Sequence, residues 1–199
     1  MLSGTPITPG CLHIQGVFTP AQCDRIVEDA LKWDPKPAEV YTNNPANDGV
    51  NTETRKGTVY SCPSNLLLNA WWKPMLDQAF IYYQRKEYPQ DIDWGNIEIQ
   101  MVEYSDTDDF FQKHSDSYLN ERHYGGDVRK LSMSLELTNA SYYTGCALRF
   151  YKDDGSTVRT DPIQGDAFVF PSWKQHEVTK LESGIRRALV VWYHGPFWR

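Results

Sequence analysis

The sequence has only four cysteines and no long apolar run. The cysteines form no CxxC pair, which argues against a zinc knuckle and gives no reason to expect a disulfide framework. No stretch of about 18 apolar residues is present, and the opening segment MLSGTPITPG lacks a basic flank followed by an apolar stretch. We therefore expect no membrane span, no secretory signal, a cytoplasmic location, and reduced structural thiols at Cys11, Cys23, Cys62 and Cys146.

Basic residues are outnumbered by acidic ones. The chain carries 20 Lys and Arg against 26 Asp and Glu, a formal net charge of -6. Such a surface as a whole repels a phosphate backbone, although a local basic cleft could still exist. We expect no nucleic-acid partner. The length of 199 residues suits one domain with a substantial core, so residues 1–199 are predicted to form a single domain.

Aromatic residues are abundant, and the second half of the chain alternates in the manner of strands. Aromatics make up 14% of the sequence, which suits the pleated surfaces of packed sheets. From residue 97 onward, short strand-like segments follow one another with turn signals between nearly all of them and no helix. They predict an antiparallel sandwich or jelly roll over residues 96–199: IEIQMVEY, DFFQKHSD, KLSMSLELT, ALRFYK, DAFVFPS, HEVTKL and IRRALVVWYH.

Residues 1–95 predict a strand, helices and a polar loop. The segment CLHIQGVF reads as a strand, and Thr19-Pro20 as the N-cap and first residue of a helix. Residues 34–57 are rich in Pro, Asn and Thr, a length at which loops are often functional, so this segment is a candidate lid. Residues 63–89 predict one or two helices. The fold class is thus mainly β, with N-terminal helices packed on the outer face of the sandwich.

A candidate metal site begins at His114 and Asp116. In an extended segment, residues two apart point to the same face, so both side chains can reach one ion. An HxD pair arises by chance with odds of roughly one in three, so a third ligand is required. His176, which begins a later strand, completes the layout of a 2-His-1-carboxylate triad for non-haem Fe(II). A rim histidine that caps a turn is an equally good interpretation of His176 alone.

A predicted hairpin adds an arginine to this group. If residues 182–184 form a three-residue turn, His176, Arg186 and Trp192 share one sheet face, and Arg186 needs a carboxylate partner in an otherwise apolar row. The span from His176 suits a short dicarboxylic acid between metal and guanidinium. Lys180, opposite Arg186 in this register, is a rival anchor, and a one-residue slip would substitute Arg187 for Arg186.

These motifs together resemble the prolyl-4-hydroxylase-like branch of the 2-oxoglutarate/Fe(II)-dependent oxygenases, in its short bacterial and phage form. The resemblance runs through MVEYSDTDDFFQKHSDS, RKLSMSLELT, YYTGCALRF, GDAFVFPSW and HEVTKLESGIRRALVVWY, from Met101 to Tyr193. It implies a double-stranded β-helix (jelly roll). It also implies Fe(II) held by His114, Asp116 and His176. The expected residues around 2-oxoglutarate are Arg186, Tyr104, Trp192 and Ser134.

Two departures from the family pattern concern the cosubstrate end. Where relatives often have Gly-Gly, this chain has Gly145-Cys146, so the tight turn there could be altered. Where some relatives place a tyrosine against the distal carboxylate of 2-oxoglutarate, Glu136 stands here. An ionised Glu136 would repel that carboxylate. Glu136 is therefore protonated, paired with Arg186, or turned away so that Ser132 or Ser134 lines the pocket.

The resemblance implies a dioxygenase that consumes O2 and 2-oxoglutarate, releases succinate and CO2, and hydroxylates a C–H bond. The expected substrate is a prolyl residue in a protein or peptide, or a free amino acid, with ascorbate as an optional auxiliary reductant. The alternatives are an oxidative demethylase of nucleobases or small molecules, and a metal-free jelly-roll binding module. No oligomeric state is predicted. Loop residues are candidate substrate contacts, each equally compatible with a solvated loop or core position: Arg55, Tyr60, His123, Tyr124 and Trp173.

Overall fold

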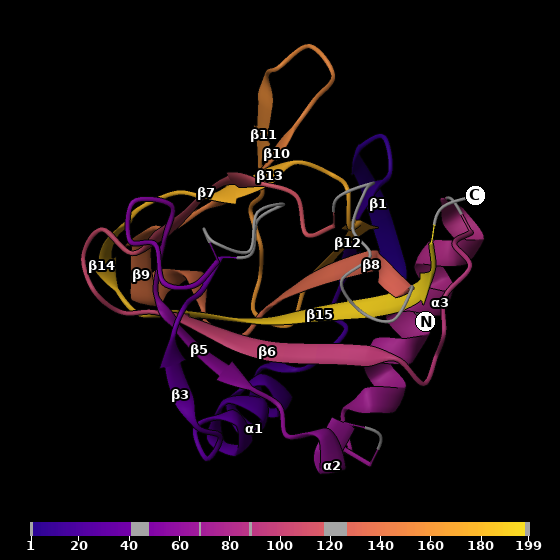
Figure 1. Cartoon of the computed structure of the whole chain (residues 1–199), viewed down its shortest axis with the longest axis horizontal. Helices are drawn as coiled ribbons and strands as arrows, with labels where there is room; N and C mark the ends of the chain where they lie inside the picture. Colours follow the sequence, from indigo (N-terminus) through magenta and orange to yellow (C-terminus); the bar gives the residue numbers. More distant parts are fainter. Residues whose placement is uncertain (1, 41–47, 68, 88, 118–126, 198–199) are drawn as a thin grey trace.

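The computed structural model describes residues 2–197 except 41–47, 68, 88 and 118–126, and its core consists of two facing antiparallel sheets (Figure 1). The eight-stranded sheet has the order β1 (Ser3–Thr8), β2 (Cys11–Gln15), β12 (Ala167–Pro171), β8 (Asp127–Glu136), β15 (Arg186–Pro196), β6 (Ile97–Tyr104), β5 (Thr58–Ser61), β3 (Pro35–Pro37). The five-stranded sheet has the order β11 (Thr157–Arg159), β10 (Leu148–Tyr151), β13 (His176–Val178), β7 (Phe110–His114), β4 (Arg55–Lys56). Two further strands, β9 (Tyr143–Gly145) and β14 (Leu181–Gly184), pair with each other. This arrangement is the predicted jelly roll.

The α-helices lie in the N-terminal part of the chain, before β6, and cover the outer face of the eight-stranded sheet (Figure 1). They are α1 (Pro20–Ala30), α2 (Ser64–Leu67) and α3 (Lys73–Lys86), with a 3-10 turn, η2, at Ala140–Tyr142. The side chain of Thr19 accepts from the amide of Gln22, and the side chain of Gln22 accepts from the amide of Thr19. This capping box fixes the start of α1, so the predicted N-cap is confirmed.

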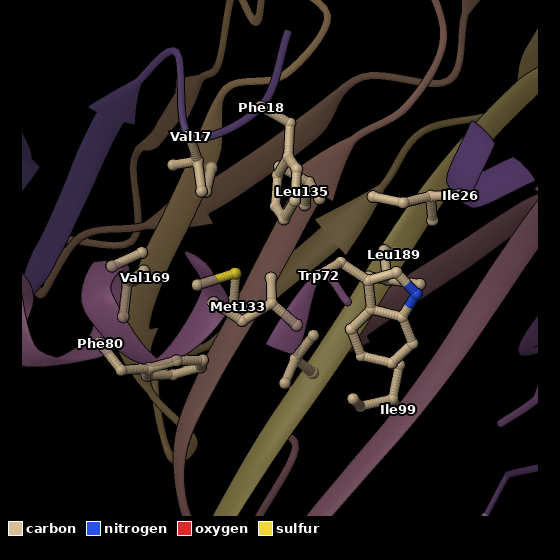
Figure 2. Close-up of a cluster of buried hydrophobic side chains, with 14 of the residues drawn as sticks. Val17, Phe18, Ile26, Trp72, Phe80, Ile99, Met133, Leu135, Val169 and Leu189 are labelled. Carbon is tan, nitrogen blue, oxygen red and sulfur yellow. The ribbon is translucent and has the colours of Figure 1, made fainter. Parts of the chain in front are cut away.

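The main hydrophobic core lies between these helices and the large sheet. Alternate residues of the central strands point to this side because successive side chains of a strand face opposite ways. Figure 2 shows Trp72 and Phe80 lying against the sheet beside Met133 and Leu189. The buried cluster includes Phe18, Ile26, Trp72, Phe80, Ile99, Met133, Leu135, Val169, Leu189 and Val191. The core of the large sheet thus holds the central strands rigidly while their other face is turned toward the second sheet.

The predicted hairpin between residues 176–181 and 185–194 is wrong. Strand β13 pairs with β10 and β7, whereas β15 pairs with β6 and β8, so the two segments lie in opposite sheets. The chain crosses between the sheets through β14, which pairs with β9. Gly184 is needed for that pairing: its φ is +81°, and an added Cβ would lie 2.0 Å from the carbonyl oxygen of Tyr142. The glycine therefore marks a close backbone approach, and not a hairpin turn.

None of the helices in the described ranges combines the length and the apolar character needed to cross a membrane.

Candidate active site

His114, Asp116 and His176 meet at one point between the sheets. His114 ends β7 and His176 begins β13, and the two residues are direct cross-strand partners. Asp116 follows two residues after His114, where its amide donates to the carbonyl of Ser172 at 2.8 Å. Oδ1 of Asp116 lies 3.5 Å from Nε2 of His114 and 3.7 Å from Nε2 of His176. One ligand atom from each residue lies within 4.8 Å of the others, a spacing that a single metal ion can bridge.

The hydrogen bonds of the two imidazoles fix which nitrogen is available. Nδ1 of His114 lies 2.8 Å from the carbonyl of Gln112, and Nδ1 of His176 lies 2.9 Å from the carbonyl of Lys174. A carbonyl only accepts, so each Nδ1 carries the proton and donates, and each Nε2 presents its lone pair to the centre of the triad. Phe111 stacks on the ring of His114 with centroids 3.4 Å apart and holds its plane.

The electrostatics of the triad suit a cation. Burial lowers the pKa of His176 to about 4, with repulsion from His114 in the same direction and Asp116 opposing it, so the ring is neutral at pH 7. Burial disfavours ionisation of Asp116, but His176 and His114 outweigh it and hold its pKa well below the usual range. Oδ2 of Asp116 is buried with no hydrogen-bond partner among the described residues. A buried carboxylate oxygen without a donor, beside two imidazole lone pairs, fits a divalent metal ion, and the donor set fits Fe(II).

A cavity of about 1010 Å³ opens from the triad between the two sheets. Its walls come from β6, β7, β8, β13 and β15, the strands whose inward faces the jelly roll brings together. Along β15, Arg186, Ala188, Val190 and Trp192 all line this cavity, as their common parity predicts. The predicted cosubstrate residues Tyr104, Ser134 and Trp192 also line it.

The structure distinguishes Arg186 from Arg187 and Lys180, the two other candidates for the cosubstrate anchor. Arg186 is 3% exposed and lines the cavity, whereas Nε of Arg187 contacts Oε2 of Glu103 at 2.6 Å on the other face of the sheet. Lys180 is exposed and lies 3.2 Å from Oδ1 of Asp108. Lys180 is therefore wrong as a rival anchor, because the hairpin that placed it opposite Arg186 does not form.

Glu136 adopts one of its three predicted arrangements. Its Oε2 accepts from Nε of Arg186 at 2.9 Å, and both side chains are almost fully buried. Of the two serines considered as alternatives, Ser134 lines the cavity, while the hydroxyl of Ser132 donates to that of Ser172 at 2.9 Å. Glu136 thus pairs with Arg186 at the closed end of the cavity, and Ser134, two residues earlier on β8, lines the cavity.

The sequence interpretation missed Tyr143 as part of this closed end. Tyr143 hydrogen bonds with both Glu136 and Arg186, and Cys146 with Arg186. Burial raises the pKa of Tyr143 to about 12 and that of Cys146 to about 11, so both are neutral at pH 7. The Gly145-Cys146 pair, noted as unusual in the sequence, was the sequence feature that pointed to this end of the cavity. The turn is retained because Cys146, like Gly145, adopts a positive φ, at 48°.

The mouth of the cavity carries polar groups from several elements. The guanidinium of Arg129 lies 3.9 Å above the ring of Trp192 and is held by Glu98 at 2.7 Å. Arg55, a predicted contact, lines the cavity with its guanidinium 4.5 Å over Phe111 and donates to the carbonyl of Glu39 at 2.8 Å. Arg129 was missed because its position in a strand gives no sign of the pocket.

Other predicted substrate contacts lie elsewhere. Tyr60, on β5, packs against the main core under the helices, so its predicted role at the lid is wrong. Trp173 is 43% exposed and is neither a core residue nor among those that line the cavity. His123 and Tyr124 lie outside the described residues, as do residues 41–47 of the predicted lid.

The fold and the triad together define a jelly roll with a candidate 2-His-1-carboxylate metal site. Residues 99–194 match the family model described as the 2OG-Fe(II) oxygenase superfamily. Over these residues, just under half of the chain, the sequence matches that superfamily, and the resemblance inferred from the motifs is confirmed to that extent. No curated protein sequence matches the chain.

Solved structures with the same fold include several prolyl hydroxylases. A prolyl-4-hydroxylase of Pseudomonas putida is 16% identical, with a TM-score of 0.68 and 94% of each chain covered. A prolyl hydroxylase of Trichoplax adhaerens, solved with a hypoxia inducible factor peptide fragment, is 15% identical, with a TM-score of 0.65 and coverage of 94% of this chain and 84% of that one. A viral collagen prolyl hydroxylase from Paramecium Bursaria Chlorella virus-1 is 11% identical, with a TM-score of 0.61 and coverage of 94% and 96%. At these identities the likeness shows the shared fold.

Proposed function

We propose that the protein is an Fe(II)- and 2-oxoglutarate-dependent dioxygenase that hydroxylates a C–H bond of a prolyl residue in a protein or peptide, or of a free amino acid. The observation that carries this proposal is the convergence of two imidazole Nε2 atoms and one carboxylate at one end of a cavity, with Arg186 lining the same cavity. Such a pairing of metal ligands and a buried guanidinium suits a ligand that has an oxo-acid at one end and a carboxylate at the other.

Each part of the site has a distinct task in this proposal. Iron, when bound together with 2-oxoglutarate and O2, supplies the oxidant that breaks the C–H bond. His114, Asp116 and His176 hold the metal on one side and leave its other side open to the cavity. Arg186 binds the distal carboxylate of the cosubstrate, and the ring of Tyr104 lies 5.8 Å below its guanidinium. The two sheets exclude water from the closed end of the cavity.

Further observations bear on the substrate and on the alternative functions. The similar solved structures include prolyl hydroxylases, one of them with a peptide fragment, which supports a prolyl substrate. Charged residues of both signs border the cavity mouth, among them Glu39, Asp48, Arg55 and Arg129, which suits a polar peptide or amino acid. The net charge of -6 weighs against a nucleobase demethylase acting on a polynucleotide. The buried triad weighs against a metal-free binding module.

The test is conversion of 2-oxoglutarate to succinate by the purified, Fe(II)-loaded protein. The natural chain should turn over and His114→Ala should not, whereas Glu177→Gln should retain turnover because Glu177 contacts Arg149 and Tyr151 outside the cavity. Panels of proline-containing peptides and of amino acids, screened by mass spectrometry for addition of one oxygen atom, then identify the substrate. Turnover that survives His114→Ala would exclude this triad as the iron site.

A further inference from the structure

The closed end of the cavity contains an ion pair that already satisfies the charge of Arg186. Strands β8 and β15 are neighbours, and they place Glu136 opposite Ala188, two residues from Arg186 on the same face. Nε of Arg186 donates to Oε2 of Glu136 at 2.9 Å, with side-chain exposures of 3% and 1%. This bond uses Nε, so the terminal nitrogens of the guanidinium are outside the ion pair, although Tyr143 and Cys146 also hydrogen bond to Arg186. An incoming carboxylate can therefore reach Arg186, but it finds one carboxylate there already.

The groups around Glu136 do not supply a second positive charge. The amide of Thr138 lies 3.4 Å from Oε1, and the hydroxyl of Tyr143 hydrogen bonds to the carboxylate. The other titratable groups nearby include Tyr104 on β6, Cys146 after β9, Cys23 on α1 and Asp166 before β12, and the charges of Asp109 and Arg55 act on Tyr104 from farther away. Burial raises the pKa of each of these cysteines and of Tyr104 to between about 11 and about 12, so they are neutral at pH 7. Asp166 accepts hydrogen bonds from His13 and Gly16.

The charges at this end therefore cancel before any ligand binds. One guanidinium faces one carboxylate in a site almost without access to water. The distal carboxylate of 2-oxoglutarate would add a second negative charge beside the same guanidinium. Two carboxylates that share one site cannot both remain ionised at low cost, and the usual outcome is that one of them holds a proton. Burial already raises the pKa of Glu136, against the opposing effect of Arg186, so Glu136 is the residue that protonates more readily.

We propose that binding of 2-oxoglutarate is accompanied by uptake of one proton from solvent onto Glu136. The proposal rests on the function proposed above, since it requires a dicarboxylic cosubstrate. The protonated carboxyl remains next to Arg186 and gains a donor that can hydrogen bond to the ligand carboxylate. Glu136 is thus a specificity-determining residue: it allows a dicarboxylate to bind at low pH and weakens its binding as pH rises. A 2-oxo acid without the distal carboxylate adds no charge and requires no proton.

The proton count can be measured by titration calorimetry of the Fe(II)-loaded protein without oxygen. The binding heat of 2-oxoglutarate, recorded in buffers of different ionisation enthalpy, gives the number of protons taken up. One proton is expected for 2-oxoglutarate and none for 2-oxopentanoate, which lacks the distal carboxylate. Across about pH 6 to 8, the Kd for 2-oxoglutarate should rise up to about tenfold per pH unit, because proton uptake on binding makes affinity fall with rising pH.

Two variants separate Glu136 from other sources of protons. Glu136→Gln keeps the size and polarity of the side chain and cannot take up a proton, so its uptake should fall to zero and its Kd should lose the slope with pH. Glu103→Gln is the matched control, because Glu103 forms the equivalent ion pair with Arg187 on the opposite face of the sheet. This control should keep the uptake of one proton.

The outcomes distinguish this inference from the proposed function. If the natural chain binds 2-oxoglutarate without taking up a proton, or if Glu136→Gln takes up as many protons as the natural chain, the role of Glu136 is refuted while the cosubstrate assignment stands. If neither the natural chain nor the variant binds 2-oxoglutarate, the proposed function itself fails, and the proton coupling fails with it. The comparison of the two oxo acids on the natural chain decides the question even if Glu136→Gln does not fold.

Discussion

Arg186 and Arg187 are adjacent in sequence and lie on opposite faces of β15, each in contact with a glutamate of a neighbouring strand. Arg186 contacts Glu136 of β8 inside the jelly roll, at 2.9 Å, and Arg187 contacts Glu103 of β6 on the other face, at 2.6 Å. The two pairs have the same chemistry but differ in burial and in access to the cavity. They therefore form an internal comparison between a structural ion pair and one at a binding site.

Arg186→Leu should weaken 2-oxoglutarate binding by about 10- to 100-fold, because a charge-assisted bond to the distal carboxylate is lost. Arg187→Leu should leave the affinity unchanged and cost about 1 kcal/mol or less of stability, as partly exposed ion pairs do. Calorimetric titration with 2-oxoglutarate measures both. Since Arg186→Leu leaves Glu136 buried without its partner, Arg186→Leu/Glu136→Leu removes the pair together and provides a folded form. If only the Arg187 variant lost 2-oxoglutarate binding, the anchor would be Arg187, and the assignment to Arg186 would be refuted.

Fe(II) should stabilise the natural chain and fail to stabilise Asp116→Asn. A metal present at 100 times its Kd adds about 2.7 kcal/mol to the free energy of unfolding, which corresponds to several degrees in Tm. The asparagine removes the charged ligand between the two imidazoles. Glu177→Gln is the matched control, since Glu177 is next to His176 in β13 but contacts Arg149 and Tyr151. Thermal melts without oxygen, with and without Fe(II), give the result. If Fe(II) raised the Tm of Asp116→Asn as much as that of the natural chain, the triad would be contradicted.

Gly145→Ala should destabilise the protein by about 2 kcal/mol more than Gly155→Ala. Both glycines have positive φ, at 74° and 81°, so both substitutions carry the same backbone strain. An added Cβ at Gly145, however, would lie 2.3 Å from the carbonyl oxygen of Lys180, whereas nothing lies within 4 Å at Gly155. The difference therefore isolates the close approach of β9 and β14. Chemical denaturation measures it, and equal losses would show that the two strands separate easily.

Asp166→Asn should remove part of the protein's acid sensitivity. Burial disfavours the ionised carboxylate of Asp166, but hydrogen bonds from His13, Gly16 and Ile163 outweigh it and lower its pKa. A lowered pKa contributes stability that is present above the unfolded value, near pH 4, and is lost as pH falls through the folded value.

The asparagine variant should therefore be less stable by about 1 to 2 kcal/mol at pH 7, and the difference should shrink below about pH 4. Denaturation curves recorded from neutral to acid pH measure this. Asp161→Asn, an exposed position of the same loop, should change stability by less than about 0.5 kcal/mol. A difference between the natural chain and the Asp166 variant that stays constant into acid would contradict the assigned role.

The sequence predicted those features of the site that depend on local geometry. The alternation within β15 is a property of one strand, so it correctly placed Arg186, rather than Arg187, on the same face as Trp192. His114 and Asp116 are close in sequence, and their proximity required only an extended segment. Pairing between strands is different, because turn residues at 182–184 suit a hairpin as well as a strand that crosses between sheets. The close contact of Gly184 with Tyr142 belongs to a distant segment and has no local signal.

The partner of Glu136 shows the same limit of local information. The sequence placed this carboxyl near the cosubstrate and could not choose among protonation, pairing and rotation away. The choice depends on the lateral order of β8 and β15, which only the assembled sheet defines. The missed Tyr143 has a similar origin, because it reaches the closed end of the cavity from β9, outside both main sheets.

The direct cross-strand pairing of His114 with His176 has a consequence for the order of events during folding. The two histidines are about 60 residues apart in the chain, and closing a loop of that length is a late, non-local step compared with helix formation. Until β7 and β13 pair, the polypeptide offers only His114 and Asp116, which are too few to retain a metal ion tightly. Capture of iron should therefore report completion of the five-stranded sheet. Stopped-flow refolding with a metal-sensitive signal would time that event directly.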